Sequence, residues 1–198
     1  MNLSRQEFRQ QIRQLRRQLS PQFQYQSGLE LVEQFATLPE LTNAHHIALY
    51  LSADGEVDTQ PLIEWLWQQG KQVYLPVIHP FSKGHLLFLH YQADTEMVLN
   101  QYRILEPKLK QPLIQPLTKL DLICTPLVAF DSTGHRLGMG GGYYDRTLEA
   151  WFKHGQGAKP IGLAHDCQHV SRLPIESWDV PLPKIVTPSR VWHWESHL

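Results

Sequence analysis

The sequence predicts a single α/β domain over residues 1–198, with a mostly parallel central sheet covered by helices on both faces. Segments with strand character alternate with segments of helical periodicity along the chain, and this alternation is typical of parallel α/β sheets. The segment "DLICTPLVAF", residues 121–130, is almost wholly apolar, as expected for a strand buried in the middle of such a sheet. A length of 198 residues with 42% hydrophobic and 19% charged residues is ordinary for one soluble globular domain.

The first half of the chain predicts two helices, a strand and a third helix. Ser4 followed by Glu7 has the spacing of a capping box, so a helix is expected to begin at Ser4. Its apolar residues recur at helical spacing: Phe8, Ile12, Leu15 and Leu19. Pro21 then interrupts the chain, and we expect an amphipathic helix over 23–38, a buried strand over 45–52, a turn over 53–58, and a helix over 60–69 that Thr59 caps and Gly70 ends.

The second half predicts further strands and one more helix. Strands are expected over 71–78, 85–91, 121–130 and 160–165, and a helix over 143–154. Prolines punctuate residues 94–119, so no element is assigned there, and prolines in 172–192 exclude a long helix.

Composition limits the class of protein. The net charge of −1 gives no overall attraction to nucleic acid or to an anionic membrane. Cys124 and Cys167 lie far apart in the sequence, the eleven histidines show no metal-ligand spacing, and no serine or cysteine nucleophile motif is present. No segment has the apolar length of a signal peptide or a membrane span. We therefore expect a soluble, cytoplasmic protein. We also expect small-molecule substrates and a monomer, although the composition itself does not give the oligomeric state.

The segment "GHRLGMGGGYYDR", residues 134–146, holds four glycines in five positions directly before the helix over 143–154. A loop without side chains lets backbone N–H groups approach phosphate oxygens, and the helix N-terminus adds further donors. Asp145 could hold Mg²⁺, and Arg136 could donate to the same anion. The segment matches neither the P-loop nor the dinucleotide fingerprint. A flexible turn, with Asp145 merely favourable at a helix N-terminus, is the alternative.

The first twenty residues carry five arginines and one acidic residue, Glu7, for a local charge of +4. On a helix, Arg5, Arg9 and Arg16 project together beside the apolar stripe, whereas Arg13 and Arg17 point further toward solvent. The first three could therefore lean into a cleft and bind a polyphosphate. A solvated arginine face is the alternative, and a nucleic-acid-binding role is weaker because no interleaved aromatic residues accompany the arginines.

Several single residues have two interpretations each. Glu56 follows a strand and could bind the amide-like edge of a heterocycle, or Glu56 and Asp58 could be simple turn residues. Tyr143 and Tyr144 could stack on a flat ligand or pack in the core, and one of each is expected. Asp179 could be a second metal ligand or a turn residue, and its spacing does not decide.

The segments "RLGMGGGYYDR", "PLVAFD", "YLSADGEVDT" and the N-terminal "RQEFR…LRRQL" together resemble the 5-formyltetrahydrofolate cyclo-ligase family. The resemblance is collinear over nearly the whole chain and includes "ILEP" and "LPIESWDVPLP". It implies a three-layer α/β/α sandwich and an ATP- and magnesium-dependent conversion of 5-formyltetrahydrofolate to 5,10-methenyltetrahydrofolate through a phosphorylated N5-iminium.

The resemblance also implies roles for individual residues. Arg9, Arg136, Tyr143 and Asp145 would act in catalysis. ATP would be bound by Arg5, Arg9, Arg136, Leu137, Gly138, Met139, Gly140, Gly141, Gly142, Tyr143 and Tyr144. The folate would be bound by Leu51, Glu56, Met139, Gly140, Gly141, Gly142 and Tyr143. Magnesium would be held by Asp145 and Asp179.

The sequence departs from the family pattern at two places. The first basic position is often lysine in the family and is Arg5 here, which replaces a point charge by a planar fork of donors. Some relatives carry a basic residue inside the glycine loop, where this chain has Met139 and Gly141. The alternative function is an ATP-independent α/β enzyme on a phosphorylated small molecule, of sugar-phosphate isomerase or CoA-transferase type, which would use Glu56 as its base or nucleophile.

Overall fold

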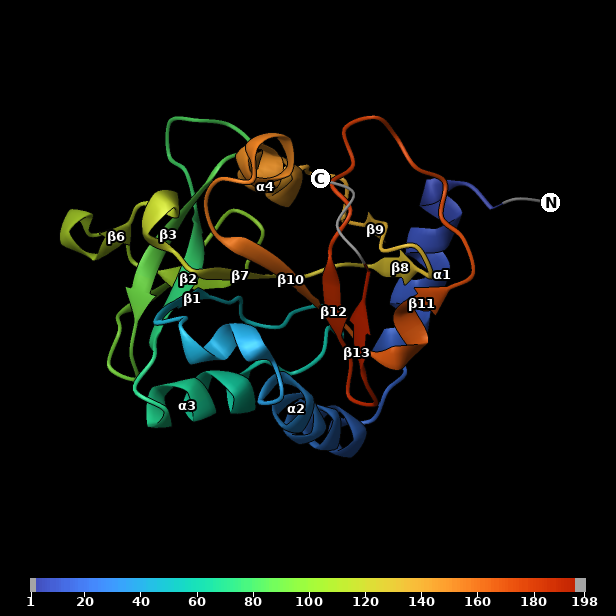
Figure 1. Cartoon of the computed structure of the whole chain (residues 1–198), viewed down its shortest axis with the longest axis horizontal. Helices are drawn as coiled ribbons and strands as arrows, with labels where there is room; N and C mark the ends of the chain where they lie inside the picture. The colour runs from blue at the N-terminus through green and yellow to red at the C-terminus, as the bar shows by residue number, and fades with distance from the viewer. Residues whose placement is uncertain (1–2, 195–198) are drawn as a thin grey trace.

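A computed structural model describes residues 3–194 and shows three layers (Figure 1). The central sheet lies between helices α2 and α3 on one face and helix α4 on the other, while α1 lies at the side of the molecule next to a smaller sheet. This arrangement confirms the predicted α/β/α sandwich.

The central sheet has eight strands in the order β13-β12-β10-β7-β1-β2-β3-β6. The parallel strands are β12 (Lys184–Val186), β10 (Lys159–Leu163), β7 (Leu122–Thr125), β1 (His46–Ala48) and β2 (Gln72–Ile78). The antiparallel edge strands are β13 (Val191–His193), β3 (Leu86–Tyr91) and β6 (Ile114–Gln115). The sheet is therefore mostly parallel, and the carboxyl ends of its inner strands meet at one edge.

The helices that cover the sheet are α2 (Pro21–Phe35), α3 (Gln60–Gln68) and α4 (Tyr143–His154). Leu31, Phe35 and Leu62 pack with the sheet in one buried cluster on the first face, and Leu148 belongs to the cluster on the opposite face. Pro21 does not precede α2 but begins it, because its fixed φ and missing N–H suit the first helical position.

Thr59 is the N-cap residue of α3, as predicted, but its side chain does not cap the helix. The Thr59 hydroxyl donates instead to the carbonyl of Tyr50 at 2.6 Å, and no side-chain cap bond is made from Thr59 to α3. At the N-terminus of α3, the side-chain acceptor is instead the Asp58 carboxylate, which accepts from the N–H of Gln60 at 3.0 Å.

The prediction of one strand over 121–130 is wrong. β7 ends at Thr125, Pro126 breaks the ladder, and the chain continues as β8 (Ala129–Asp131) in a second sheet with β9 (Arg136–Leu137) and β11 (His169–Val170). Helix α1 (Arg5–Arg17) packs against this small sheet through Ile12. The capping box that Ser4 and Glu7 predict is present, whereas Leu15 of the predicted apolar stripe is 48% exposed.

Residues 94–119, left unassigned from the sequence, hold a short hairpin, the edge strand β6 and two 3₁₀ helices. The hairpin consists of β4 (Met97–Leu99) and β5 (Leu105–Pro107). Its tip is built by Asn100, whose side-chain oxygen accepts from the N–H groups of Tyr102 and Ile104 at 2.9 and 3.1 Å. The Glu106 carboxylate accepts from Asn100 and from the N–H of Ile78, which fixes the tip beside the end of β2. The 3₁₀ helices are η1 (Pro39–Thr42), η2 (Gln111–Leu113), η3 (Leu117–Lys119) and η4 (Asp166–Gln168).

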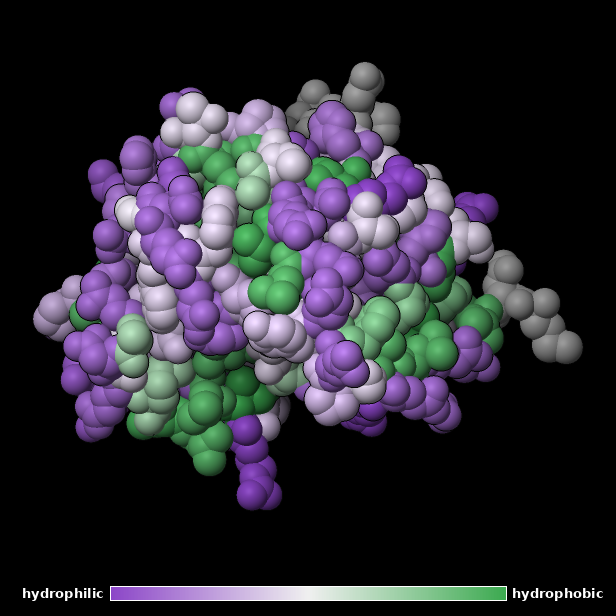
Figure 2. Space-filling model, turned by 90° about the horizontal axis from the view of Figure 1, so that it is seen from below, coloured by the Kyte–Doolittle hydropathy of each residue, from purple (hydrophilic) through white to green (hydrophobic). Residues whose placement is uncertain are grey.

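The surface on the side of α2 and α3 shows separate apolar patches among polar side chains (Figure 2). Within residues 3–194, none of the helices combines the length and the apolar character that crossing a membrane requires.

Candidate active site

A cavity of about 910 Å³ lies beyond the carboxyl ends of β1, β2 and β7. In open α/β sheets this edge is where ligands bind. Four segments wall the cavity: helix α1, the turn after β1, the hairpin tip at 100–106, and the glycine loop at 138–142. The residues predicted from the sequence that line it are Arg5, Arg9, Arg16, Leu51, Glu56, Arg136, Gly138, Met139, Gly140, Gly141, Gly142, Tyr143, Tyr144 and Asp145.

The glycine loop connects β9 to α4, and its conformation requires glycine at two positions. Gly140 and Gly142 have φ of +104° and +67°, which L side chains adopt only with strain. Gly142 is the N-cap of α4 and provides no side-chain cap bond. The first N–H groups of α4 are therefore left for a ligand at the cavity surface.

The structure does not bring Leu137 to this surface. Leu137 is 1% exposed and packs with Ile12 and Val128 in the core beneath α1. Its carbonyl accepts from the N–H of Val128 at 2.7 Å, so Leu137 faces the core although Arg136 and Gly138 on either side of it line the cavity.

Arg136 and Asp145 form a buried ion pair at the base of the loop. The Arg136 Nη2 donates to Asp145 Oδ1 at 2.7 Å, and the side chains are 3% and 21% exposed. Burial lowers the pKa of Arg136 from its ordinary value, and the charge of Asp145 opposes that shift. The Arg136 Nε is buried and has no hydrogen-bond partner within residues 3–194, so one donor of the guanidinium is available in the cavity wall.

Arg5 and Asp179 form a second ion pair, which joins α1 to the loop before β12. Arg5 Nη2 donates to Asp179 Oδ1 at 2.9 Å, and Arg5 Nη1 pairs with Oδ2. The N–H of Glu176 also donates to Oδ2, at 2.8 Å. Burial acts to raise the pKa of Asp179, but the Arg5 hydrogen bond outweighs it and the net pKa is lowered. Both carboxylate oxygens of Asp179 are thus engaged by protein donors.

Arg9 reaches the glycine loop directly. Its Nε donates to the carbonyl of Gly138 at 2.9 Å. Burial, followed by the nearby charge of Arg5, lowers the pKa of Arg9. The guanidinium therefore lies beside the loop, in position to meet an anion bound there.

The remaining arginines of α1 converge on Asp54, in the turn after β1. Arg13 Nε and Arg16 Nη2 donate to Asp54 Oδ2 at 2.7 and 2.9 Å, and Arg17 pairs with Oδ1. The expectation that Arg13 points away from the cleft is wrong, because Arg13 lines the cavity. Burial would raise the pKa of Asp54, but the three arginine hydrogen bonds lower it to about 2.

Arg16 is fully buried and ties three segments together. Its Nε donates to the carbonyl of Asp54 at 2.7 Å, and its Nη1 donates to the carbonyl of Leu127 at 3.2 Å. The side chain has no exposed area. Arg16 thus holds α1, the turn after β1 and the chain after β7 in one arrangement.

Glu56 lies in the turn that Asp54 anchors. Its Oε2 accepts from the N–H of Ala53 at 3.0 Å. Burial of the carboxyl group raises its pKa to about 7, against the lowering effects of the Ala53 N–H and the Arg16 charge. The group can therefore be protonated or ionised near neutral pH, and it faces the cavity beside Leu51.

Tyr143 and Tyr144 occupy different environments, as the sequence led us to expect. Tyr144 packs against the buried cluster that contains Leu148, and its hydroxyl is buried without a hydrogen-bond partner within the described residues. The Tyr143 hydroxyl shares a hydrogen bond of 3.1 Å with Tyr102 at the hairpin tip. This bond joins the hairpin to the start of α4 across the cavity.

Sequence reasoning missed several cavity residues. Tyr102, Arg103 and Ile104 lie in the unassigned segment, and Tyr50 lies within the predicted strand over 45–52. Trp178, 65% exposed, also lines the cavity. An exposed tryptophan next to the candidate metal residue Asp179 is the one signal that could have indicated this position.

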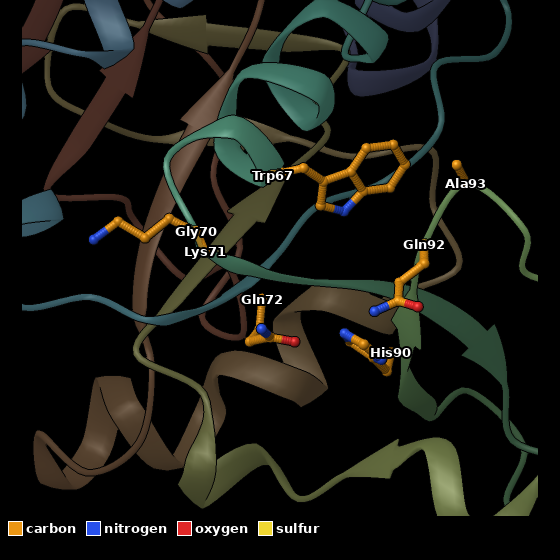
Figure 3. A pocket seen from close by; sticks show the side chains of 7 residues that line it. All are labelled: Trp67, Gly70, Lys71, Gln72, His90, Gln92 and Ala93. Atoms are coloured by element: carbon orange, nitrogen blue, oxygen red, sulfur yellow. The ribbon is translucent and has the colours of Figure 1, made fainter.

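A second cavity, of about 300 Å³, lies elsewhere and has no free charged group (Figure 3). Trp67 and Lys71 flank it, at the end of α3 and before β2. Lys71 extends away from the other labelled side chains and donates to the carbonyls of Leu41 and Ala44 at 2.8 and 2.7 Å. The Trp67 indole N–H donates to the carbonyl of Tyr91. This cavity therefore offers no comparable set of reactive groups.

The fold and the cavity define an α/β protein whose glycine loop, arginines and buried acid face one site. The family model of the 5-formyltetrahydrofolate cyclo-ligase family matches residues 2–188. The chain therefore belongs to this family.

Curated relatives and solved structures agree with this assignment. The 5-formyltetrahydrofolate cyclo-ligase of Escherichia coli strain K12 is 56% identical over 183 residues, which are 92% of this chain and 100% of the relative. The enzyme of the same name from Haemophilus influenzae is 51% identical over 90% of this chain and 94% of the relative. The NMR structure of Aquifex aeolicus 5,10-methenyltetrahydrofolate synthetase is 28% identical, with a TM-score of 0.80 over 98% of this chain and 97% of that chain.

Proposed function

We propose that this protein converts 5-formyltetrahydrofolate to 5,10-methenyltetrahydrofolate with consumption of ATP in the presence of Mg²⁺ and release of ADP and phosphate. One observation carries the proposal beyond family membership. The same cavity is lined by the glycine loop with its arginines and by the turn that holds Glu56. The residues that we propose for phosphate binding and those that we propose for the heterocycle thus line one cavity, where two substrates could meet.

The nucleotide half of the proposed site combines backbone donors with arginines. Gly140 to Gly142 present a surface without side chains, and the start of α4 favours an anion by its dipole. Arg9 and Arg136 add positive charge beside the loop. Arg5 pairs with Asp179 and would reach the nucleotide by exchanging that carboxylate for a phosphate.

The folate half is formed by Glu56 and an apolar wall. A carboxyl group can accept from the N–H groups on the amide-like edge of a pterin, and the raised pKa of Glu56 suits partial proton sharing there. Leu51, Ile78 and Ile104 supply apolar contact surface for the flat ring. Since all these residues come from one chain, we further propose that the protein functions as a monomer.

Magnesium fits this donor set through Asp145. Mg²⁺ in phosphate sites is held by one or two carboxylates, with phosphate oxygens and water as the remaining ligands, and within residues 3–194 no cluster of three or more His, Cys, Asp or Glu side chains could hold a metal alone. Asp145 Oδ1 accepts from Arg136, whereas no protein hydrogen bond to Oδ2 is seen within these residues. Asp179 would join as a ligand only after Arg5 releases it. Bound magnesium would compensate the negative charge of the phosphates.

The proposed chemistry needs alignment and charge compensation rather than a protein nucleophile. The formyl oxygen on N5 attacks the γ-phosphorus of ATP, and the bond to the ADP oxygen breaks, which leaves a phosphorylated N5-iminium. N10 then attacks the iminium carbon and loses its proton, and the carbon–oxygen bond breaks to release phosphate. Backbone N–H groups and arginines around the transferred phosphoryl group stabilise such a loose transition state. Tyr143 lies where it would contact both the nucleotide and the folate.

An absorbance assay tests the proposal. Purified protein is mixed with 5-formyltetrahydrofolate, ATP and Mg²⁺, and the near-ultraviolet band of the methenyl product is followed over time. We expect a rise in absorbance that requires both ATP and Mg²⁺. A flat trace from folded protein, or a rise that does not depend on ATP, would reject the proposal.

A further inference from the structure

Arg146 ends the sequence motif "GGGYYDR", and the proposed chemistry assigns it no role. It is exposed in the first turn of α4 and does not line the cavity. A positive charge at a helix N-terminus is unfavourable to the helix dipole. The position of Arg146 therefore calls for a separate reason.

The guanidinium of Arg146 connects the glycine loop to the loop between β2 and β3. Its Nη1 donates to the carbonyl of Gly141 at 2.8 Å and to the carbonyl of Gly84 at 3.3 Å. The backbone comes close at both places: a Cβ on Gly142 would lie 3.1 Å from Nη1, and a Cβ on Gly84 would overlap the guanidinium. Arg146 thus fills a space that glycines leave open on each side.

The bond to Gly141 fixes the orientation of one peptide plane. In a trans peptide the C=O and the following N–H point in opposite directions. Gly141 and Gly142 line the cavity and Arg146 does not, so the carbonyl held by Arg146 is turned out of the cavity. The N–H of Gly142 is accordingly the group of this peptide that faces into the cavity.

Without Arg146, the peptide between Gly141 and Gly142 would lose the hydrogen bond that fixes its orientation. A peptide flip changes ψ of the preceding residue and φ of the following one, and both residues here are glycines, which tolerate most backbone angles. The flipped peptide would direct a carbonyl oxygen toward a bound phosphate. A favourable donor would then be replaced by a repulsive acceptor.

We propose that Arg146 is a positioning residue for ATP: by holding the Gly141 carbonyl against Gly84, it keeps the Gly142 N–H directed at the phosphates. The inference rests on the proposed function of the cavity. It also makes the β2–β3 loop, through Gly84, a part of the nucleotide site that does not itself contact the nucleotide.

The test perturbs the contact from both of its sides. Arg146→Met removes the donor, Gly84→Ala displaces the guanidinium without changing α4, and Arg146→Lys keeps one donor. Lys153→Met is the matched control, since Lys153 is an exposed cation on the same helix that pairs with Glu149. Each variant is measured for kcat, for KM of ATP and of 5-formyltetrahydrofolate, and for Tm.

Losing one hydrogen bond to a charged group weakens binding by about tenfold to a hundredfold, and a peptide free to flip retains part of that donor. We therefore expect KM for ATP to rise about tenfold in Arg146→Met and also to rise in Gly84→Ala, while KM for folate and the control stay within about twofold of wild type. The double variant should be no worse than the more impaired single variant, because both changes break one contact. Arg146→Lys should recover most of the ATP affinity.

Unchanged KM for ATP in Arg146→Met would overturn the inference, and so would equal losses for both substrates with a lowered Tm. Calorimetric measurement of ATP binding distinguishes a failure of this inference about Arg146 from a failure of the proposed function. If the wild type binds ATP but does not cyclise folate, the proposed function fails while the ATP affinities of the variants still test Arg146. If the wild type binds no ATP, both fail.

Discussion

Arg136 on β9 and Asp145 on α4 form an ion pair of 2.7 Å that closes the glycine loop at its base. The Arg136 side chain is 3% exposed, so its charge depends on this carboxylate for compensation within the protein. Together with the packing of Leu137 and Tyr144 in the core, this ion pair fixes the two ends of the loop, so the loop itself can remain almost free of side chains.

Asp145→Asn is expected to lower turnover about 100-fold or more, since the proposed magnesium ligand loses its charge and the phosphates lose part of their charge compensation. It should also lower the free energy of unfolding by about 3 kcal/mol, because Arg136 is left buried without its counter-charge. The measurements are the absorbance assay and urea unfolding. Replacing both partners, as Arg136→Met with Asp145→Leu, should recover much of the stability and none of the activity. A double variant as unstable as Asp145→Asn would contradict this explanation.

Glu56→Gln is expected to make the protein more stable at pH 8 relative to wild type. The pKa of Glu56 is about 7 in the folded protein, against 4.5 for an ordinary glutamate. Above pH 4.5 the folded state thus holds a proton that the unfolded chain has lost, so the stability contributed by this group falls as pH rises to about 7. Over that pH range, the total loss in the free energy of unfolding from this group is on the order of 3 kcal/mol.

The measurement is urea unfolding of wild type and Glu56→Gln at pH 5, 6, 7 and 8. Burial, followed by the charge of Arg16, lowers the pKa of His165 to about 4, and stability from this group is lost as pH falls below 6.5. His165 titrates in both proteins, so the difference between their curves isolates Glu56. A difference that does not change with pH would show that Glu56 is not responsible. Affinity for folate should fall in the variant at every pH.

Arg16→Met should destabilise the protein by about 3 kcal/mol, because it removes a fully buried guanidinium that binds the carbonyl and carboxylate of Asp54 and shares the carbonyl of Leu127 with Gln168. Arg17→Met is the control. Arg17 pairs with the same carboxylate, but its side chain is 54% exposed, and exposed pairs contribute about 1 kcal/mol or less. Urea unfolding of both variants gives the comparison. Equal losses of unfolding free energy in the two variants would mean that burial of Arg16 does not increase its contribution to stability.

Gly140→Ala should weaken ATP binding while leaving the fold intact. A Cβ would meet only the Arg9 guanidinium, at 3.6 Å, so the cost arises from the backbone, which has φ of +104°. Gly155→Ala is the control, because Gly155 ends α4 with φ of +64° and a Cβ there would meet nothing within 4 Å. Calorimetry with ATP should show weaker binding in Gly140→Ala alone. Similar losses in both variants would indicate a general effect of strain.

The sequence predicted helix α4 over its full length because both ends carry local signals. Glycines precede Tyr143, and Gly155, in the left-handed conformation, ends the helix. The break in 121–130 had no such signal: an apolar run shows burial, and Pro126 alone does not reveal that the chain leaves one sheet for another. The hairpin at 97–107 was missed because the Asn100–Glu106 contacts that build its tip are specific to the folded chain.

The residues that line the cavity could be grouped from the sequence where they lie in one continuous segment. The glycine loop, Arg136 and Asp145 fall within ten residues, so their proximity could be predicted, while their roles stay predictions. The surroundings of Asp54 could not be predicted, since its three arginine partners lie 37 to 41 residues earlier in the sequence. Leu137 belongs to the same motif as the loop, but the alternation along β9 turns it into the core.

Helix α1 has a consequence for how a cut in the chain would be felt. Its arginines pair with Asp54 and with Asp179, and Asp179 lies 174 residues after Arg5 in the sequence. The cavity wall that α1 forms is therefore held by two segments that are distant from each other in the chain. A proteolytic cut in the loop before β12 should loosen α1 and weaken nucleotide binding without touching the glycine loop.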